Sequence, residues 1–291
     1  MGFTAGIDLG SVYTKAAIID DAGLLAGTAL RRTGFKLEEA AHEAFEDALR
    51  AAGTNRGEID YVASTGYGRN QVGFRDLQVT DLTAQSWGTR FFFPGTRTVL
   101  DIGGQTMKSM RLDEEGRVHT FRLNDKCAAG TGAFLEKTAR YLGYTIEEIG
   151  PLVEFSKESV PISGVCAVFA ESEVINHVSN GAQAADIMHG AMESLIERSV
   201  RLMKRVQMEP EFTLVGGLMR FPTMVRVMRE QLGESVNVPT DPLSQFTGAI
   251  GAGVLARRRL EKLGRDTGRT SELQPAGRVA EREWPVPDCP A

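Results

Sequence analysis

Residues 99–135 read VLDIGGQTMKSMRLDEEGRVHTFRLNDKCAAGTGAFL, and this stretch decides the predicted fold. Its apolar beginning predicts a strand that ends at Asp101, and Gly103-Gly104 predicts a tight turn before a hairpin around residues 113–116. Backbone N–H groups at such glycines can approach a phosphate, while an aspartate at the strand end can hold the metal ion of a nucleotide. The stretch is therefore a candidate phosphate-binding turn.

The same stretch contains Cys127, which is followed by small residues and then by a helical pattern. We expect this cysteine to lie near a helix N-terminus, where the helix dipole lowers the pKa of a thiol and favours an anionic ligand or cluster. Taken alone, a cysteine is as often a small buried apolar residue. The sequence thus places a phosphate turn and a candidate thiolate in one segment.

GIDLGSVYTKAAIID, residues 6–20, repeats the order of strand, aspartate, glycine and second strand. Asp8 ends the first strand, and the turn that begins at Gly10 offers Ser11, Thr14 and Lys15 as donors to phosphate oxygens. No helix is predicted directly after the glycine, which argues against a dinucleotide-binding start, and the sequence has no P-loop motif. The two copies predict an α/β protein of two duplicated lobes that close on a nucleotide between them.

Hydrophobic periodicity and turn residues predict the other elements. Strands are expected at residues 3–8, 16–19, 61–65, 98–102, 212–215 and 236–238. Helices are expected at residues 37–52, 80–90, 146–155, 168–178, 186–208 and 247–260, with one after Cys127 to about residue 142 and one from about residue 221. Strands and helices thus alternate along most of the chain, as in an α/β protein.

The order of elements predicts the domain boundaries. Residues 1–97 form the first predicted lobe, completed by the helix at 247–263, and residues 98–246 form the second lobe with its cysteines. Gly216-Gly217 is a third glycine turn, and Gly248 begins a small-residue helix suited to close packing beneath a nucleotide. Residues 264–291 are polar and contain prolines, and we expect a loosely ordered tail.

Length and charge limit the class of protein. A chain of 291 residues is long enough for two lobes, and a net charge of -5 without a basic patch gives nucleic-acid binding little support. No apolar run reaches the roughly 18 residues of a membrane span. The start of the chain lacks the basic and apolar regions of a signal peptide. We therefore expect a cytoplasmic protein with no nucleic-acid or membrane partner.

The three cysteines, Cys127, Cys166 and Cys289, are too widely spaced to suggest a disulfide framework. In a reducing compartment they would be free, catalytic or bound to metal. Cys289 lies in the polar tail, and we do not expect it to be a metal ligand. Two further questions stay open: the loop TGYGRN, residues 65–70, is a plain turn or a ligand-facing one, and Glu171 and Glu173 face either the nucleotide or solvent.

The turns at Asp8, Asp101 and Gly216-Gly217 resemble the phosphate and adenosine motifs of the acetate and sugar kinase, heat-shock chaperone and actin superfamily. The segments TGYGRN, NDKCAAGTGAFL (124–135) and CAVFAESEVI (166–175) are similar to one subgroup of it. This subgroup comprises the activator ATPases of 2-hydroxyacyl-CoA dehydratases and the ATP-binding subunits of benzoyl-CoA reductases. The resemblance covers residues 3 to about 260, which is nearly the whole chain except its tail.

The resemblance implies two ribonuclease-H-like lobes, ATP with Mg²⁺ in the cleft, and a 4Fe-4S cluster shared between two subunits. Cys127 and Cys166 would be the cluster ligands, and Asp8, Asp101 and Gln105 the catalytic residues. The implied nucleotide-binding residues are Gly10, Ser11, Thr14, Lys15, Gly103, Gly104, Gly216, Gly217 and Gly248. Thr106-Met107 depart from the acidic and aliphatic pair expected in the family, which slightly weakens any role assigned beyond Gln105.

The implied function is an ATPase that delivers a low-potential electron to a CoA-thioester reductase or dehydratase component. Ferredoxin or flavodoxin would supply the electron. A 4Fe-4S cluster takes four thiolates, so two chains with two cysteines each would complete it, and the second chain is identical or paralogous. General likeness favours the benzoyl-CoA reductase type. The alternatives are a small-molecule kinase without a cluster and a non-enzymatic actin-like nucleotide switch.

Overall fold

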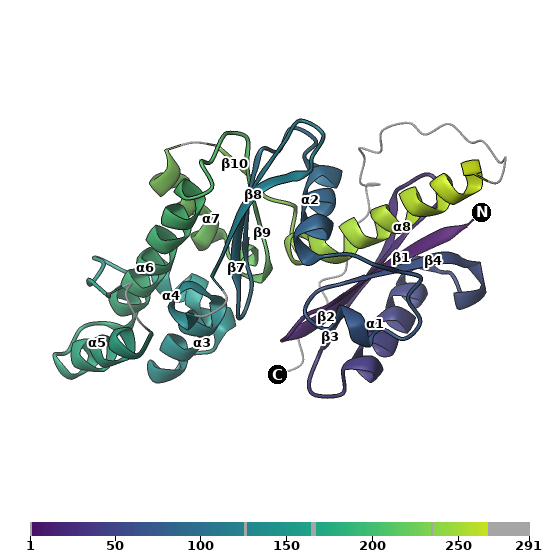
Figure 1. Cartoon of the computed structure of the whole chain (residues 1–291). Helices are drawn as coiled ribbons and strands as arrows, with labels where there is room; N and C mark the ends of the chain where they lie inside the picture. The colour runs from purple at the N-terminus through teal and green to yellow at the C-terminus, as the bar shows by residue number, and fades with distance from the viewer. Residues whose placement is uncertain (1, 125–126, 164–166, 234, 267–291) are drawn as a thin grey trace. The chain divides into compact units, whose positions relative to one another are not determined.

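The computed structural model describes residues 2–124, 127–163, 167–233 and 235–266 (Figure 1). The chain divides into two compact units, which we call the first and second lobe. The first lobe comprises Met1–Thr96, Glu114–Val118 and Pro239–Ala291, and the second comprises Arg97–Asp113 and His119–Val238. Within the described ranges, every helix is too short or too polar to cross a membrane.

The sheet of the first lobe has the strand order β3-β2-β1-β4-β5. Its strands are β1 (Phe3–Leu9), β2 (Tyr13–Ile19), β3 (Leu25–Arg32), β4 (Ile59–Thr65) and β5 (Leu77–Gln78). The hairpin strands β1, β2 and β3 pair antiparallel, whereas β4 pairs parallel to β1 and β5 parallel to β4. The central strand β1 therefore ends beside the end of β4, and Asp8 lies at that edge.

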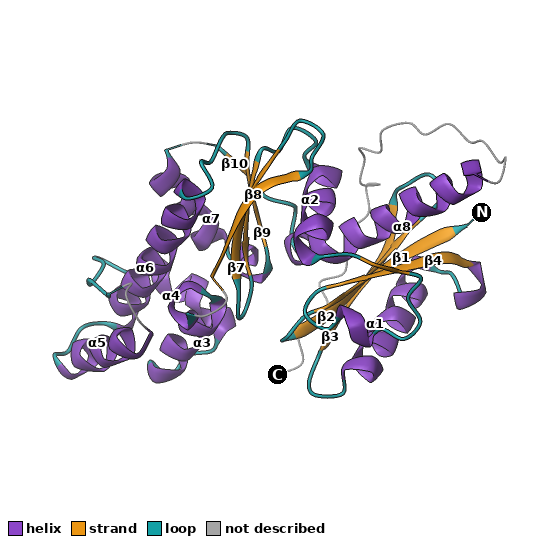
Figure 2. Ribbon diagram, in the orientation of Figure 1, coloured by secondary structure: helices purple, strands orange, loops and turns teal. Residues whose placement is uncertain are grey.

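Helices pack on both faces of this sheet (Figure 2). They are α1 (Leu37–Ala52), α2 (Asp81–Phe92) and α8 (Thr247–Asp266), with the short 3₁₀ helices η1 (Arg56–Glu58), η2 (Arg69–Gln71) and η6 (Leu243–Gln245). Side chains alternate along β1, so Ile7 joins the core beneath α1, whereas Gly6 faces α8. Because a side chain at Gly6 would overlap the Ala249 carbonyl, this glycine allows α8 to pack directly on the strand.

The sheet of the second lobe has the order β10-β9-β6-β7-β8. Its strands are β6 (Thr98–Ile102), β7 (Met107–Leu112), β8 (Val118–Asn124), β9 (Phe212–Val215) and β10 (Val236–Asn237). β7 pairs antiparallel to β6, and β9 and β10 continue the sheet in parallel. Read from its other edge, the second sheet has the order β8-β7-β6-β9-β10. This is the order of the first sheet with five added to each strand number. The duplication expected from the two aspartate turns therefore extends to the whole sheet.

The helices of the second lobe enclose its largest core. They are α3 (Gly132–Tyr141), α4 (Ile149–Glu154), α5 (Ala167–Ser179), α6 (Ala184–Lys204) and α7 (Pro222–Leu232), with the 3₁₀ helices η3 (Ala128–Gly130), η4 (Ile146–Glu148) and η5 (Gly217–Arg220). Met188, Met192 and Met203 on α6 are fully buried and belong to this core.

The structure differs from two predictions of secondary structure. α6 ends at Lys204 rather than at residue 208, because the chain turns at Gln207, which adopts a left-handed φ of 56°. The strand β3 (Leu25–Arg32) was not predicted, although its buried and less buried residues alternate from Leu25 to Leu30. Glycine and alanine make this alternation weak in the sequence, so a hydrophobic pattern alone does not reveal it.

Candidate functional site

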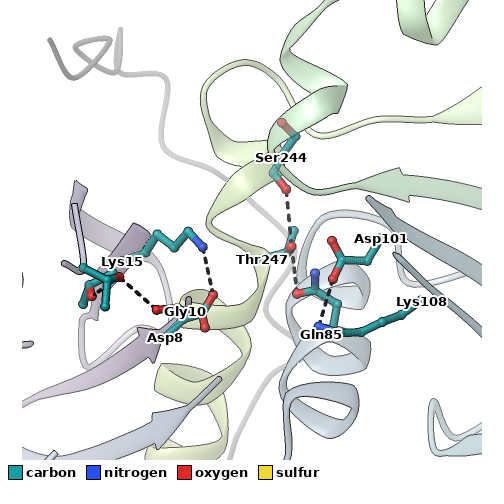
Figure 3. Close-up of polar contacts among 10 residues, drawn as sticks. Asp8, Gly10, Lys15, Gln85, Asp101, Lys108, Ser244 and Thr247 are labelled. Atoms are coloured by element: carbon teal, nitrogen blue, oxygen red, sulfur yellow. Dashed lines mark hydrogen bonds and ion pairs between the residues drawn. The ribbon is translucent and has the colours of Figure 1, made fainter. Parts of the chain in front are cut away.

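In the first lobe, the carboxylate of Asp8 and the ammonium of Lys15 meet across the β1–β2 hairpin (Figure 3). The two residues are partners in the strand register, and Nζ lies 3.4 Å from Oδ2. Both side chains keep 18% of their surface exposed, so this pair is accessible to a ligand. Gly248 begins α8 against the same carboxylate, because a side chain there would lie 3.0 Å from Oδ2 of Asp8.

The second lobe repeats this arrangement at Asp101 and Lys108, which are also partners in the strand register. Nζ of Lys108 lies 3.4 Å from Oδ2 of Asp101 (Figure 3). The turn between the two strands is closed by the N–H of Gly103, which donates to the carbonyl of Thr106 at 2.9 Å, and it leaves Gly104 and Gln105 exposed. Sequence reasoning missed Lys108, although its position after Asp101 equals that of Lys15 after Asp8.

A glycine follows the neighbouring parallel strand in each lobe and lies against the aspartate. Gly66 after β4 and Gly216 after β9 have left-handed φ angles of 89° and 98°. A side chain on Gly66 would overlap Oδ1 of Asp8, and one on Gly216 would overlap Oδ1 of Asp101. The loop TGYGRN therefore lies at the candidate phosphate turn, and the N–H of Gly68 donates to the carbonyl of Leu9 at 2.8 Å. This position favours the ligand-facing interpretation of the loop.

Other residues near Asp8 form a supporting layer. The hydroxyl of Thr14 is buried and shares a hydrogen bond of 2.9 Å with Thr33, which in turn donates to the carbonyl of Gly10 at 2.9 Å. Thr14 thus holds the turn from inside the lobe, whereas Ser11 is exposed. Gln85, which sequence reasoning also missed, accepts a hydrogen bond of 3.0 Å from Thr247 next to Gly248 (Figure 3).

The candidate phosphate turn of the second lobe is hydrogen-bonded directly to the start of α3. The N–H of Gly132 donates to the carbonyl of Gly103 at 3.0 Å, and the N–H of Ala133 donates to the carbonyl of Gly104 at 2.8 Å. A side chain on Gly132 would lie 3.3 Å from both the Gly103 oxygen and the Gly104 Cα, so the two segments are in close contact. We call these two hydrogen bonds the α3 clamp.

Cys127 lies just before the α3 clamp, at the end of β8. Its thiol is free and partly exposed. The carbonyl of Cys127 accepts a hydrogen bond of 3.2 Å from Asn124, and Nη1 of Arg198 lies 3.6 Å from its Sγ. Cys127 is the N-cap residue of the short 3₁₀ helix η3, and α3 begins only at Gly132. A nearby positive charge comes from Arg198.

The chain before Cys166 is tied to two helices, although Cys166 and Cys289 lie outside the described residues. The N–H groups of Lys157 and Glu158 donate to the carboxylate of Asp186 on α6 and hold its pKa below the usual range. Glu173 on α5 accepts a hydrogen bond of 2.5 Å from the N–H of Ser163.

The two glutamates of α5 therefore have structural partners. Glu173 holds the segment that leads to residue 166, and Glu171 forms an ion pair with Lys137 on α3. Among the described residues, no three histidine, cysteine, aspartate or glutamate side chains are grouped as a metal site. Cys127 is thus the described thiol that a metal centre would use, and α5 begins at the residue after Cys166.

Known proteins resemble this chain over nearly its whole described length. The BadF/BadG/BcrA/BcrD ATPase family matches residues 5–256. The activator of lactoyl-CoA dehydratase from Anaerotignum propionicum is 37% identical over 260 residues, which cover 89% of this chain and 99% of that protein. A benzoyl-CoA reductase subunit from Thauera aromatica is 36% identical, with coverage of 91% and 96%.

A solved structure has the same fold. The activator of the 2-hydroxyisocaproyl-CoA dehydratase from Clostridium difficile with bound ADPNP superimposes with a TM-score of 0.85 at 34% identity. The comparison covers 93% of this chain and 100% of that one. The α/β architecture with two duplicated actin-like ATPase lobes, expected from the sequence, is therefore confirmed.

The glycine beside Asp101 provides a test of this site. We expect Gly216→Ala to lower the free energy of unfolding by about 1–3 kcal/mol, because a left-handed φ and an overlap with the Asp101 carboxylate must both be relieved. Gly217→Ala is the matched control, since φ there is ordinary and no atom lies within 4 Å of the added Cβ. Urea denaturation followed by circular dichroism measures both variants. Equal stability of the two would contradict the close contact at Gly216.

Proposed function

Because this chain belongs to the BadF/BadG/BcrA/BcrD ATPase family, we propose that it is an ATP-hydrolysing iron–sulfur protein that transfers electrons. It couples ATP hydrolysis to delivery of a low-potential electron to a CoA-thioester reductase or dehydratase component. The names of its relatives, a dehydratase activator and a component of benzoyl-CoA reductase, support this class of partner. The observation that carries the proposal is the α3 clamp, which joins a phosphate turn to the segment after Cys127.

The nucleotide end of the proposal uses the two aspartate–lysine pairs. Asp8 and Asp101 hold Mg²⁺ directly or through water and help to orient the attacking water. The ammonium groups of Lys15 and Lys108 and the N–H groups of the glycine turns stabilise negative charge on the phosphates. Gln105, exposed on the turn after Asp101, is suited to contact the water or the terminal phosphate. Bound Mg²⁺ supplies the Lewis acid that neutralises phosphate charge during hydrolysis.

The glycines of the site have a spatial role in this proposal. Gly10, Gly103 and Gly104 bring backbone donors close to phosphate, while Gly216 and Gly248 keep side chains away from the two carboxylates. Gly217 adds an open backbone position next to Gly216, and exposed Ser11 offers a further hydroxyl donor. We leave Thr14 out of the phosphate contacts, because its buried hydroxyl is engaged by Thr33.

The cluster end uses Cys127 and Cys166. The partly exposed Cys127 thiol beside a guanidinium fits a ligand of an anionic cluster, since the positive charge favours the thiolate. A 4Fe-4S cluster takes four thiolates, so two subunits with two cysteines each would complete one shared cluster. The assignment of Cys166 rests on its sequence motif. Once bound, the cluster supplies the one-electron carrier, with ferredoxin or flavodoxin as the electron donor in the cytoplasm.

The α3 clamp gives the two ends a physical connection. A nucleotide that binds the Gly103-Gly104 turn acts on a backbone whose carbonyls hold the first N–H groups of α3. If ATP and ADP stabilise different positions of this turn, α3 and the Cys127 segment must follow. Linkage then requires that the state of the cysteine end change the preference for ATP over ADP by the same factor.

Sequence identity to these relatives does not decide which of the two partner components receives the electron. Identities of 37% to the lactoyl-CoA dehydratase activator and 36% to the benzoyl-CoA reductase component are equal for this purpose. Both types need the same ATPase and the same electron carrier. The proposal therefore names the shared chemistry, reduction of a CoA thioester by one electron at low potential, and leaves the second chain of the dimer identical or paralogous.

Removal of a proposed Mg²⁺ ligand tests the nucleotide end. We expect Asp101→Ala and Asp101→Asn to lower Mg-dependent ATP hydrolysis at least about a hundredfold, because charge stabilisation at the phosphates is lost. Iron content should stay at the wild-type level, since the carboxylate lies on the phosphate turn rather than among the thiols. Asp21→Ala is the control, as Asp21 is exposed in a turn away from the site. ATPase activity within a few-fold of wild type would remove Asp101 from the catalytic set.

Serine substitutions test the cluster end. Anaerobically purified wild-type protein should be brown, with about four irons per dimer. We expect Cys127→Ser and Cys166→Ser each to lose the iron and to weaken dimerisation, because a shared metal centre links the chains. Nucleotide affinity should largely survive, and Cys289→Ser serves as control with normal iron. Iron analysis, sedimentation and nucleotide titration measure these effects, and a dimeric Cys166→Ser protein with a full cluster would refute the ligand set.

A bulkier residue in the α3 clamp tests the coupling itself. We expect Gly132→Val to force α3 away from the Gly103-Gly104 turn, since even a Cβ would lie 3.3 Å from both residues. In wild-type protein, the rate at which a chelator removes iron should differ between the ATP and ADP states. In the variant this ratio should approach one, while the control Asp21→Ala should keep it. An unchanged ratio in Gly132→Val would show that the clamp does not transmit nucleotide state.

A further inference from the structure

The side chain of Arg198 lies beneath the loop that follows Cys127. Arg198 belongs to α6, and a side chain on Gly130 would lie 2.6 Å from its Cδ. Because Gly130 has no side chain, the arginine stem passes under the loop and brings Nη1 to 3.6 Å from Sγ of Cys127. The position of this guanidinium is therefore set by backbone packing rather than by a surface contact.

The guanidinium of Arg198 contacts the sulfur of Cys127. Within the residues that the structure describes, no carboxylate forms an ion pair with Arg198. Its Nε is buried and has no hydrogen-bond partner in the same part of the chain. Arg201, the other arginine of α6, differs, since it is exposed and pairs with Glu197 on the helix surface. The described partner of this partly buried guanidinium is therefore the Cys127 sulfur.

We propose that Arg198 is a positioning residue that holds Cys127 and makes the reduction potential of the cluster bound there less negative. This inference rests on the proposed function. A positive charge and an N–H donor near a ligand sulfur stabilise the reduced cluster, which carries one more electron than the oxidised cluster. Arg198 thereby sets how easily an external one-electron donor loads the protein. It touches a ligand and not the thioester, so its effect acts through Cys127.

Different side chains contact the backbone and the sulfur of Cys127. Asn124 holds the backbone through the Cys127 carbonyl at 3.2 Å, whereas Arg198 contacts the sulfur. α6 also binds the segment before Cys166, because Asp186 accepts the N–H groups of Lys157 and Glu158. One helix therefore supports the approaches to both cysteines. Substitution of Arg198 alone should change the potential and leave the loop in place.

The experiment compares Arg198→Met, Arg198→Lys and Arg201→Met with wild type, all as full-length, anaerobically reconstituted protein. Arg201→Met is the matched control, because it removes the same charge from the exposed side of the same helix. Iron content is measured first. The cluster is then titrated with dithionite and redox mediators, and electron paramagnetic resonance gives the ratio of reduced to oxidised cluster at each potential.

We expect Arg198→Met to lower the ratio of reduced to oxidised cluster about tenfold at a fixed potential, a midpoint shift of about 59 mV to more negative values for a one-electron couple. Arg198→Lys keeps the charge without the planar fork, so its shift should be smaller and in the same direction. Arg201→Met should match wild type. If Arg198→Met does not hold a cluster, the lysine variant decides.

Three negative outcomes are distinguishable. A wild-type protein with a cluster, and Arg198 variants with the midpoint potential of Arg201→Met, would overturn the role of Arg198 and leave the proposed function intact. Iron-free wild-type protein after reconstitution would overturn the proposed function, and the role of Arg198 with it. A shift in Arg198→Met that Arg201→Met reproduces would be a general charge effect and would also refute the specific contact.

Discussion

The central constraint of each lobe is the space that a glycine leaves beside an aspartate. In both sheets the carboxylate at the end of the central strand faces the end of the adjacent parallel strand, where only a residue without a side chain fits. The left-handed φ angles of Gly66 and Gly216 are a second reason for glycine at these positions, since a Cβ in that conformation is strained even without the carboxylate. The antiparallel hairpin then brings a lysine to each aspartate through the strand register. Both lobes thus share the same strand order, the same glycine beside the aspartate and the same aspartate–lysine ion pair.

The second lobe connects this device to the cysteine end by backbone contacts. The carbonyls of Gly103 and Gly104 accept the first N–H groups of α3, so the phosphate turn and the helix move as neighbours in one hydrogen-bonded unit. α6 packs behind this unit, with Arg198 at the Cys127 loop and Asp186 at the segment before residue 166. Backbone bonds of this kind transmit small displacements better than exposed side-chain pairs, because they have little rotamer freedom.

Strands and helices could be predicted from the sequence more accurately than the contacts between them. The strand at residues 98–102 and the helix at residues 37–52 were predicted with their observed bounds, because both have strong periodicity and clear ends. Lys108 was missed although it follows Asp101 at the same spacing as Lys15 follows Asp8, and the strand register then shows that both pairs are cross-strand partners. Arg198 and the α3 clamp join residues distant in sequence, and no local pattern encodes such pairs. The 3₁₀ helix between Cys127 and α3 was not predicted either, because it is short and consists of small residues.

The two motif cysteines, Cys127 and Cys166, lie in a segment of the second lobe that has no counterpart in the first. In the first lobe the third strand, β3, leads to the single helix α1 and then to the parallel strand β4. In the second lobe β8 leads to α6 and then to β9, and α6 packs on β6 and β7 as α1 packs on β1 and β2. What the second lobe has in addition is the chain between β8 and α6, which contains η3, α3, η4, α4 and α5. Figure 1 labels the three α-helices of this segment, and both motif cysteines belong to it in the sequence. This addition begins where β8 ends and reaches the Gly103-Gly104 turn through α3, so it contacts the phosphate turn without changing the sheet. In the proposed function, a redox centre held by this segment would therefore be linked to nucleotide through the second lobe, and the first lobe has the same aspartate turn without such a segment.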